Sequence, residues 1–181
     1  MHCKNIKRIR VIKGDITQIE ADAIVNAANT FLLGGRGVDG AIHKAAGQKL
    51  LNDCKRLNGC KTGKAKLTKG HNLMAKYIIH TVGPKWRYRA PYEDVQLKNC
   101  YRSSLLLANE NGIKTIAFPC ISTGSYGFPN ERAAYIAIRT CAEMMQEIDI
   151  REVIFVCYQE MDYLIYNRIL RVTNNLTSKK H

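Results

Sequence analysis

The chain has 181 residues and a formal net charge of +13, which comes from 28 Lys and Arg against 15 Asp and Glu. Its apolar runs are short and interrupted by Lys, Asn or Gly, so a membrane span is not expected, and no apolar core follows the charged N-terminal residues as a secretory signal would require. Seven cysteines, an odd number without a C-x-x-C pair, are typical of reduced thiols and predict a cytoplasmic protein.

Apolar periodicity and Gly, Pro and Asn breaks define the expected secondary structure. The expected elements, in chain order, are a strand at 8–13, a strand at 23–26, helices at 39–46 and 48–57, strands at 64–69 and 77–82, a loop at 85–92, a helix at 93–111, a strand at 114–119, a helix at 130–148, a strand at 153–157 and a helix at 161–170. The length predicts one domain over residues 1–181, with its core at about 8–171, a short basic N-terminal segment and a polar C-terminal tail.

The alternation of strands and helices predicts an α/β fold with a largely parallel sheet and helices on both faces. Ligands of such sheets bind beyond the carboxyl ends of the strands. Three polar loops directly follow expected strands: the turn at Asp15, the loop from Asn29 to Asp39, and the loop from Ser122 to Phe128. We therefore expect these loops to converge on one cleft.

The stretch from Val25 to His43 is the most informative part of the chain. A short apolar strand leads to two asparagines, Asn26 and Asn29, and then to a loop with four glycines that opens a helix. Such loops hold phosphates, because glycine lets the backbone approach an anion and the helix N-terminus offers free N–H groups. An amide at one end and the carboxylate of Asp39 at the other add groups that can do more than bind an anion.

Several ordered motifs match one known family. They are Gly14–Thr17, Val25–Asn29, Leu32–His43, Thr62–Gly63, Ile79–Pro84, Phe118–Pro129 and Val156–Tyr158. With these motifs the chain resembles the macrodomain family, in its MacroD-type branch, over residues 8–171. The resemblance implies a three-layer α/β/α fold with a mostly parallel, mixed central sheet.

The same resemblance implies a function. It implies ADP-ribose binding and a hydrolase that cleaves ADP-ribose esters, namely mono-ADP-ribosylated acidic side chains and O-acetyl-ADP-ribose. No cofactor is implied. The alternative is a module that binds ADP-ribose without hydrolysing it; such a module does not need the carboxylate of Asp39.

Asp15 has two interpretations. Its position after a strand suits a cap or turn carboxylate, whereas the G-D-I-T match implies a hydrogen bond to the adenine amine. The resemblance further assigns a backbone N–H and an apolar contact to Ile16. It also implies substrate contacts from Gly35, Gly37 and Val38 in the first loop.

The second loop offers backbone N–H groups and hydroxyls to a pyrophosphate. The substrate-binding residues expected there are Ser122, Thr123, Gly124, Ser125, Tyr126, Gly127 and Phe128. Tyr126 and Phe128 have the size to cover the distal ribose. Tyr158, at the end of the last strand, is expected either near adenine or in the core.

Asn29 and Asp39 are the expected catalytic residues. An amide can donate to and accept from a sugar hydroxyl. Asp39 can act as a general base if burial raises its pKa; otherwise it orients the ribose while the α-phosphate holds the water. A plain helix N-cap is the remaining interpretation of Asp39. His43, one turn on, can reach Asp39 but is more simply structural, and His80 is expected to be a core histidine.

Two features limit the range of partners and ligands. Arg36 interrupts the glycine run of the family. Separately, the loop from Asn29 to Asp39 contains neither Cys nor His, so no metal is expected. The basic residues are scattered, which favours a solvated surface over nucleic-acid binding. The expected partners are ADP-ribose, its esters and mono-ADP-ribosylated proteins, and the chain is expected to be monomeric.

Overall fold

The computed structural model describes residues 4–178. A six-stranded sheet forms its centre, with the spatial order β1-β6-β5-β2-β4-β3. The strands are β1 (Ile9–Lys13), β2 (Ala23–Ala27), β3 (Ala65–Lys69), β4 (Tyr77–Thr81), β5 (Thr115–Phe118) and β6 (Glu152–Cys157). Every neighbouring pair is parallel except β3 with β4, which is antiparallel. The sheet is therefore mixed and mostly parallel, as expected.

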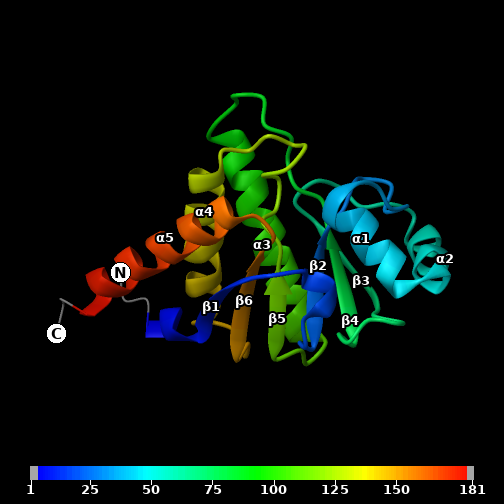
Figure 1. The fold of residues 1–181 in the computed structure, drawn as a ribbon, viewed down its shortest axis with the longest axis horizontal. Helices are drawn as coiled ribbons and strands as arrows, with labels where there is room; N and C mark the ends of the chain where they lie inside the picture. The colour runs from blue at the N-terminus through cyan, green and yellow to red at the C-terminus, as the bar shows by residue number, and fades with distance from the viewer. Residues whose placement is uncertain (1–3, 179–181) are drawn as a thin grey trace.

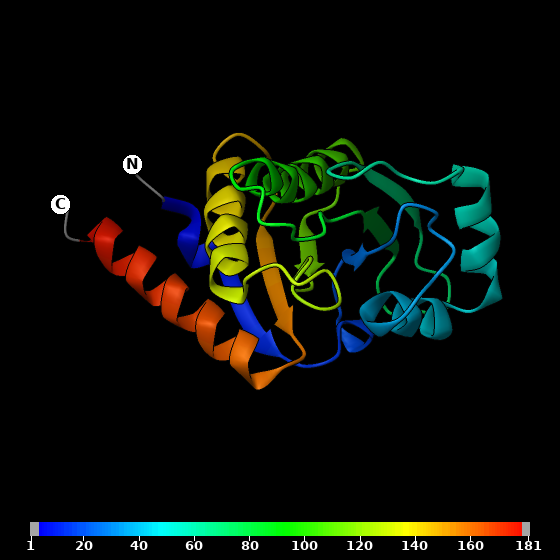
Figure 2. The same ribbon diagram turned by 90° about the horizontal axis from the view of Figure 1, so that it is seen from above.

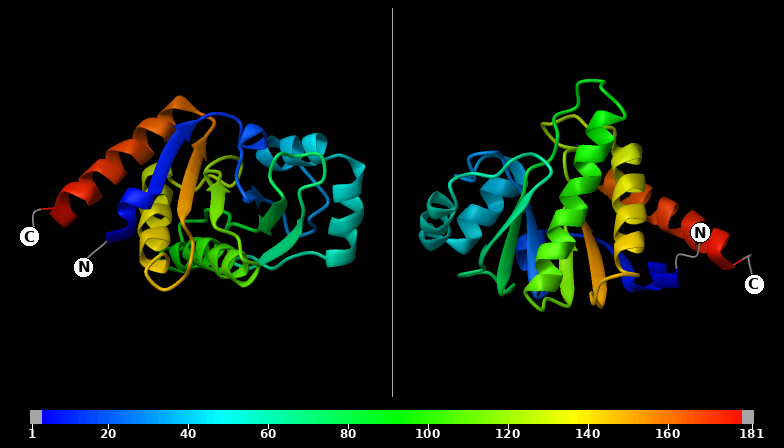
Figure 3. Two further views of the ribbon diagram at one scale, coloured as in Figure 1. Left: turned by 90° about the horizontal axis from the view of Figure 1, so that it is seen from below. Right: turned by 180° about the vertical axis from the view of Figure 1, so that it is seen from behind.

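Five α-helices surround the sheet. They are α1 (Gly37–Ala46), α2 (Gln48–Leu57), α3 (Tyr92–Glu110), α4 (Asn130–Met144) and α5 (Glu160–Ser178), with short 3-10 helices η1 (Lys4–Arg8) and η2 (Ile16–Gln18). Helices α3 and α4 cover one face and α1 lies on the other, with α2 beyond β3 (Figures 2 and 3). The long α5 packs against α4 and β1.

Two hydrophobic cores hold these layers together. One fills the space between the sheet and α3 and α4, with Tyr101, Phe118 and Phe155 at its centre. The other joins the opposite face to α1 and α2. Because β2 and β5 are covered on both faces, their residues form continuous apolar runs rather than an alternating pattern, which is typical of parallel strands.

The helix boundaries correct three expectations. The helix expected from Asp39 begins earlier, at Gly37, and the helix expected to reach residue 148 ends at Met144, where turns take over. The last helix continues to Ser178 and replaces much of the expected polar tail. None of the helices within residues 4–178 combines the length and apolar character needed to cross a bilayer.

The parallel strands end at one edge of the molecule, at the top of Figure 1. The loops that follow β2, β4 and β5 all leave from this edge. The segment after β4 (green, at the top) lies beside the loop after β5, and α1 also begins at this end of the molecule. Two of the three loops expected to converge, those after β2 and β5, therefore leave from the same edge.

Candidate active site

Asp39 lies in the first turn of α1 and is 4% exposed. Its Oδ1 accepts a hydrogen bond from Asn26 Nδ2 at 2.7 Å, and its Oδ2 lies 3.4 Å from Asn29 Nδ2. Burial raises the pKa of Asp39, while the bond from Asn26 and the nearby His43 act to lower it. The N-cap position belongs to Arg36 and no side chain caps this helix, so the interpretation of Asp39 as a helix cap is wrong.

Asn29 fixes the shape of the glycine loop. Its Oδ1 accepts hydrogen bonds from the backbone N–H groups of Phe31 at 3.0 Å and Leu32 at 3.2 Å. Its Nδ2 donates one hydrogen bond to the Gly34 carbonyl at 2.8 Å and a longer one to Asp39 Oδ2. Asn29 thus ties the loop conformation to the carboxylate.

A buried chain of hydrogen bonds supports Asp39 from within the sheet, and sequence reasoning had not assigned it to the site. Asn26 Nδ2 also contacts His80 Nδ1 at 3.1 Å, and His80 Nε2 contacts Thr68 Oγ1 at 2.9 Å. Because an amide NH2 is only a donor, His80 Nδ1 must be the acceptor and Nε2 carries the proton that reaches Thr68. Burial lowers the pKa of His80 to about 3, which keeps it neutral and confirms it as a core histidine.

His43 reaches Asp39, as its spacing suggested. Its Nε2 lies 3.6 Å from Asp39 Oδ1 and makes no hydrogen bond with the part of the chain that the structure describes. The glycine loop also lies close to the carboxylate of Asp39. A Cβ placed on Gly35 would lie 2.9 Å from Asp39 Oδ2. Gly35 therefore admits the carboxylate, and a larger residue would displace it.

The loop after β5 presents a wall of free backbone donors. Gly127 N donates to the Gly124 carbonyl at 2.9 Å and Phe128 N to the Ser122 carbonyl at 3.0 Å. The hydroxyl of Thr123 donates to the Cys120 carbonyl. The remaining N–H groups make no hydrogen bond within residues 4–178; they are those of Ser122, Gly124, Ser125 and Tyr126. Successive free N–H groups of this kind form an anion-binding concavity.

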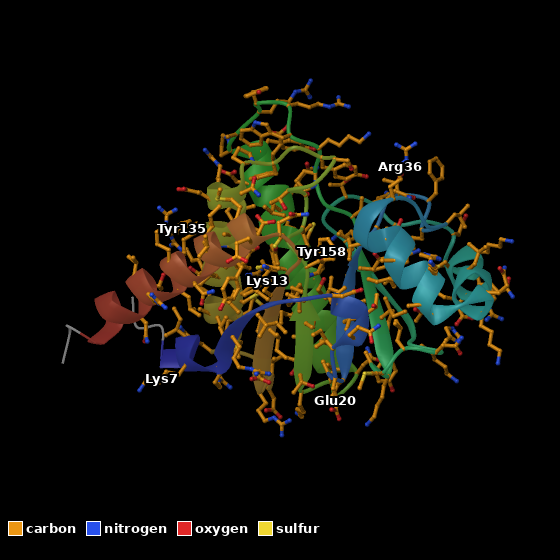
Figure 4. The ribbon with its side chains drawn as sticks, in the orientation of Figure 1. Lys7, Lys13, Glu20, Arg36, Tyr135 and Tyr158 are labelled. Carbon is orange, nitrogen blue, oxygen red and sulfur yellow. The ribbon has the colours of Figure 1, made fainter. Side chains whose placement is uncertain are left out.

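The first loop supplies the facing wall. The first turn of an α-helix leaves its N–H groups without partners inside the helix, which applies to Gly37 and Val38 in α1. Arg36, exposed, stands at the top edge above the start of α1 (Figure 4). A pyrophosphate between the two loops would meet backbone donors on both sides.

The aromatic residues take different positions. Phe128 is 1% exposed and packs against Trp86 with ring centroids 4.7 Å apart, so its side chain supports the loop from below and cannot cover a ribose. Tyr126 is partly exposed, and Lys85 Nζ lies 5.4 Å from its ring centroid. Tyr158 is 75% exposed beyond the end of β6 (Figure 4), which excludes a core role.

Asp15 caps η2 and keeps one oxygen available. Its Oδ1 accepts hydrogen bonds from Thr17 N and Thr17 Oγ1, both at 2.9 Å. Its Oδ2 has no hydrogen bond to any described residue, and the side chain is exposed. The cap interpretation and the adenine interpretation are therefore compatible. Ile16, beside it, is buried and can offer little more than its backbone.

A cavity of about 420 Å³ extends the site away from η2. It begins at Asn29 and Tyr126, and its far wall consists of residues of the segment after β4 and the start of α3. A larger cavity of about 740 Å³ lies between α2 and β3 and contains none of the expected site residues. Within residues 4–178, no three His, Cys, Asp or Glu side chains are arranged to hold a metal ion.

Comparisons with known proteins agree with this arrangement. The model of the macro domain family matches residues 25–137. A macro domain-containing protein of Methanosarcina mazei is 60% identical over 86% of this chain and 84% of its own length. The ADP-ribose glycohydrolase MACROD2 of Xenopus laevis is 56% identical over 91% of this chain, which spans only 40% of that longer protein.

Solved structures show the same fold. The Oceanobacillus iheyensis macrodomain with ADP has a TM-score of 0.88 and 42% identity, covering 91% of this chain and 90% of its own. The Trypanosoma brucei macrodomain in complex with ADP-ribose has a TM-score of 0.84 and 45% identity, covering 89% of this chain and 68% of its own. The chain therefore belongs to the macrodomain family.

Proposed function

We propose that this protein binds ADP-ribose and hydrolyses its esters with acidic side chains and with acetate, releasing ADP-ribose. Water adds, the ester bond breaks, and the products are ADP-ribose and the free carboxylic acid. The observation that carries the proposal is a buried carboxylate of raised pKa, Asp39, held by Asn26 and lying beside Asn29, which lines the cavity of the site. The names of the MACROD2 relatives and the ligands of the neighbouring macrodomains support it.

Each part of the ligand has a group suited to it. The two loops with free N–H groups face each other and suit a pyrophosphate. The open Oδ2 of Asp15 suits the exocyclic amine of adenine, and Tyr126 suits the distal ribose. These groups account for the pyrophosphate, the adenine and the distal ribose. We therefore propose that Asp39 lies beside the ester, the one part of the ligand that remains.

Two roles are proposed for Asp39. As a general base it takes a proton from the attacking water, and the raised pKa favours this role because proton transfer is most effective when the pKa approaches the working pH. As an orienting group it holds the distal ribose while the α-phosphate positions the water. In both roles Asn26 and the neutral His80 position the carboxylate.

Turnover of a mono-ADP-ribosylated acidic protein tests the proposal. Wild type should release ADP-ribose, identified by mass spectrometry, and should do so equally in EDTA because no three ligand side chains within residues 4–178 are arranged to hold a metal ion. O-acetyl-ADP-ribose should likewise yield ADP-ribose and acetate. Tight ADP-ribose binding without release from either ester would instead indicate a binding module, and no binding in calorimetry would refute the proposal altogether.

A cytoplasmic, monomeric protein is part of the same proposal. The cytoplasmic location is supported by the six described cysteines, which are all free thiols, as suits a reducing compartment. Size-exclusion chromatography with light scattering would test the monomeric state.

A further inference from the structure

We propose that the basic loop, residues 85–89, docks acidic segments of the modified protein and so selects which esters this enzyme cleaves; this rests on the proposed hydrolase function. The loop follows β4 and precedes α3. It forms the green crest at the top of Figure 1, beside the loop after β5, and Figure 3 shows the same neighbours from behind.

The basic loop has a fixed shape although it is neither helix nor strand. Glu93, at the start of α3, is 2% exposed, and its carboxylate accepts hydrogen bonds from Arg87 N at 2.6 Å and Arg89 N at 3.0 Å. Trp86 N donates to the Tyr126 carbonyl at 2.8 Å. The indole packs on Phe128. The loop is thus tied both to α3 and to the loop that is proposed to bind the pyrophosphate.

This anchoring leaves the positive charges of the loop without an acidic partner, although Lys85 Nζ lies over the ring of Tyr126. Lys85, Arg87 and Arg89 are exposed, and none of them forms an ion pair with another described residue. Glu93 contributes the carboxylate of the cavity wall, but both of its oxygens are occupied by backbone N–H groups. Three cations therefore face the solvent at one side of a single cavity.

The cavity links these cations to the reacting groups. Its volume of about 420 Å³ extends from Asn29, which contacts Asp39, to Arg87, Arg89 and the start of α3. The acid released from an ester at Asp39 belongs to a protein side chain, so the polypeptide around that side chain must leave the site through a neighbouring opening. Unpaired cations beside this opening attract carboxylates of adjacent residues.

The test compares two ADP-ribosylated peptides that differ only around the modified glutamate. One carries Asp and Glu on both sides and the other carries Ser and Gln. Turnover and affinity of both peptides are measured for wild type, for Arg87→Ala/Arg89→Ala, and for the control Arg102→Ala/Arg151→Ala. The control removes two exposed arginines outside the cavity. O-acetyl-ADP-ribose, which has no peptide, reports whether the chemistry itself is intact.

Wild type and the control should prefer the acidic peptide in kcat/KM and in affinity. The loop variant should lose about three- to tenfold on that peptide, the sum expected for two exposed charge pairs, and keep wild-type turnover of the neutral peptide and of O-acetyl-ADP-ribose. The preference should also shrink as ionic strength rises.

Equal use of both peptides by wild type, or a preference that survives in the loop variant, would overturn the docking surface. So would an unmodified single-stranded oligonucleotide that binds through Arg87 and Arg89 more tightly than the acidic peptide. Absence of turnover for all three substrates would count against the proposed hydrolysis instead, and the affinity measurements would still decide whether the loop binds acidic peptides.

Discussion

The buried carboxylate of Asp39 lowers the stability of the folded protein at the position that we propose for catalysis. The pKa of Asp39 is raised by burial, so the folded protein holds this proton more tightly than the unfolded chain. Ionising Asp39 therefore lowers the stability as the pH rises above 3.8, and the full cost applies once the pH exceeds the folded pKa. Catalytic groups are commonly kept in such unfavourable surroundings.

Asp39→Asn should therefore be more stable than wild type at neutral pH, and the difference should vanish below the ordinary pKa of 3.8. The new amide can still accept the hydrogen bond of Asn26. Urea unfolding at several pH values measures the difference. An Asn variant that is less stable than wild type at pH 7 would show that contacts of the carboxylate outweigh its burial.

Turnover separates the two roles proposed for Asp39. Asp39→Ala should lose at least about a hundredfold in kcat and keep much of the affinity for ADP-ribose, because we propose that other loops hold the adenine and the pyrophosphate. If Asp39 is the base, Asp39→Asn should be equally inactive and the wild-type rate should fall on the acid side. If Asp39 only orients the ribose, the Asn variant should stay active. Wild-type turnover by Asp39→Ala would remove Asp39 from the mechanism.

His80 should make the protein sensitive to acid. The unfolded chain protonates this ring below about pH 6.5, whereas the folded protein resists protonation until about pH 3. Proton uptake thus favours unfolding, and stability present above pH 6.5 is lost as the pH falls through this window. His80→Gln, which can accept from Asn26 and donate to Thr68, should show a shallower loss in urea titrations. If the stability of wild type and of His80→Gln changed equally with pH, His80 would not be the source of the acid sensitivity.

At the scale of the elements, one carboxylate connects α3 to the segment that precedes it. Glu93→Ala leaves two backbone N–H groups of the basic loop without their acceptor, so stability should fall by about 1–3 kcal/mol. Hydrogen exchange at residues 85–89 should quicken more than elsewhere. Glu110→Ala, an exposed acid at the other end of α3, serves as the control. Unchanged exchange in the Glu93 variant would mean that Trp86 alone holds the loop.

The elements that could be predicted from sequence are those with an apolar face packed against one of the two cores. The strands fall within one or two residues of their expected positions, and Gly47, with φ of +84°, separates α1 from α2 as expected. The continuation of α5 beyond residue 170 escaped prediction because its next two residues, Arg171 and Val172, are exposed; Val172 is 54% exposed. A helix without a buried face gives no periodic signal.

The candidate site was predictable to the extent that it lies on loops with recognisable motifs. Asp15, Asn29 and Asp39 could be assigned in this way. The support of Asp39 by Asn26 and His80 could not, because it depends on β2 lying next to β4, where these two residues are register partners. Strand order is a tertiary property that chain order leaves open.

At the scale of the whole molecule, ADP-ribose should raise the unfolding free energy by mass action. A ligand concentration of one hundred times Kd should add about 2.7 kcal/mol.

Asp15→Asn separates the two functions proposed for the Asp15 carboxylate, because its amide oxygen can still cap η2 while its NH2 cannot accept from adenine. We expect an affinity lower by about 1–3 kcal/mol in calorimetry, with nearly unchanged thermal stability of the free protein. Equal affinities would leave Asp15 as a cap alone.

The two outer strands of the sheet have a consequence for solubility. An open strand edge can recruit a strand from another molecule, and repeated recruitment leads to aggregation. Here α5 and η1 lie beside β1 at one edge. At the other edge α2 lies beside β3, and Lys66 of β3 donates to the Leu57 carbonyl at the end of α2. Lys64 and Lys69 are exposed at this edge, so an approaching copy would bring its own lysines against these two. The basic composition that we propose to attract acidic ligands at one end of the molecule should thus also oppose the pairing of sheet edges between neighbouring copies.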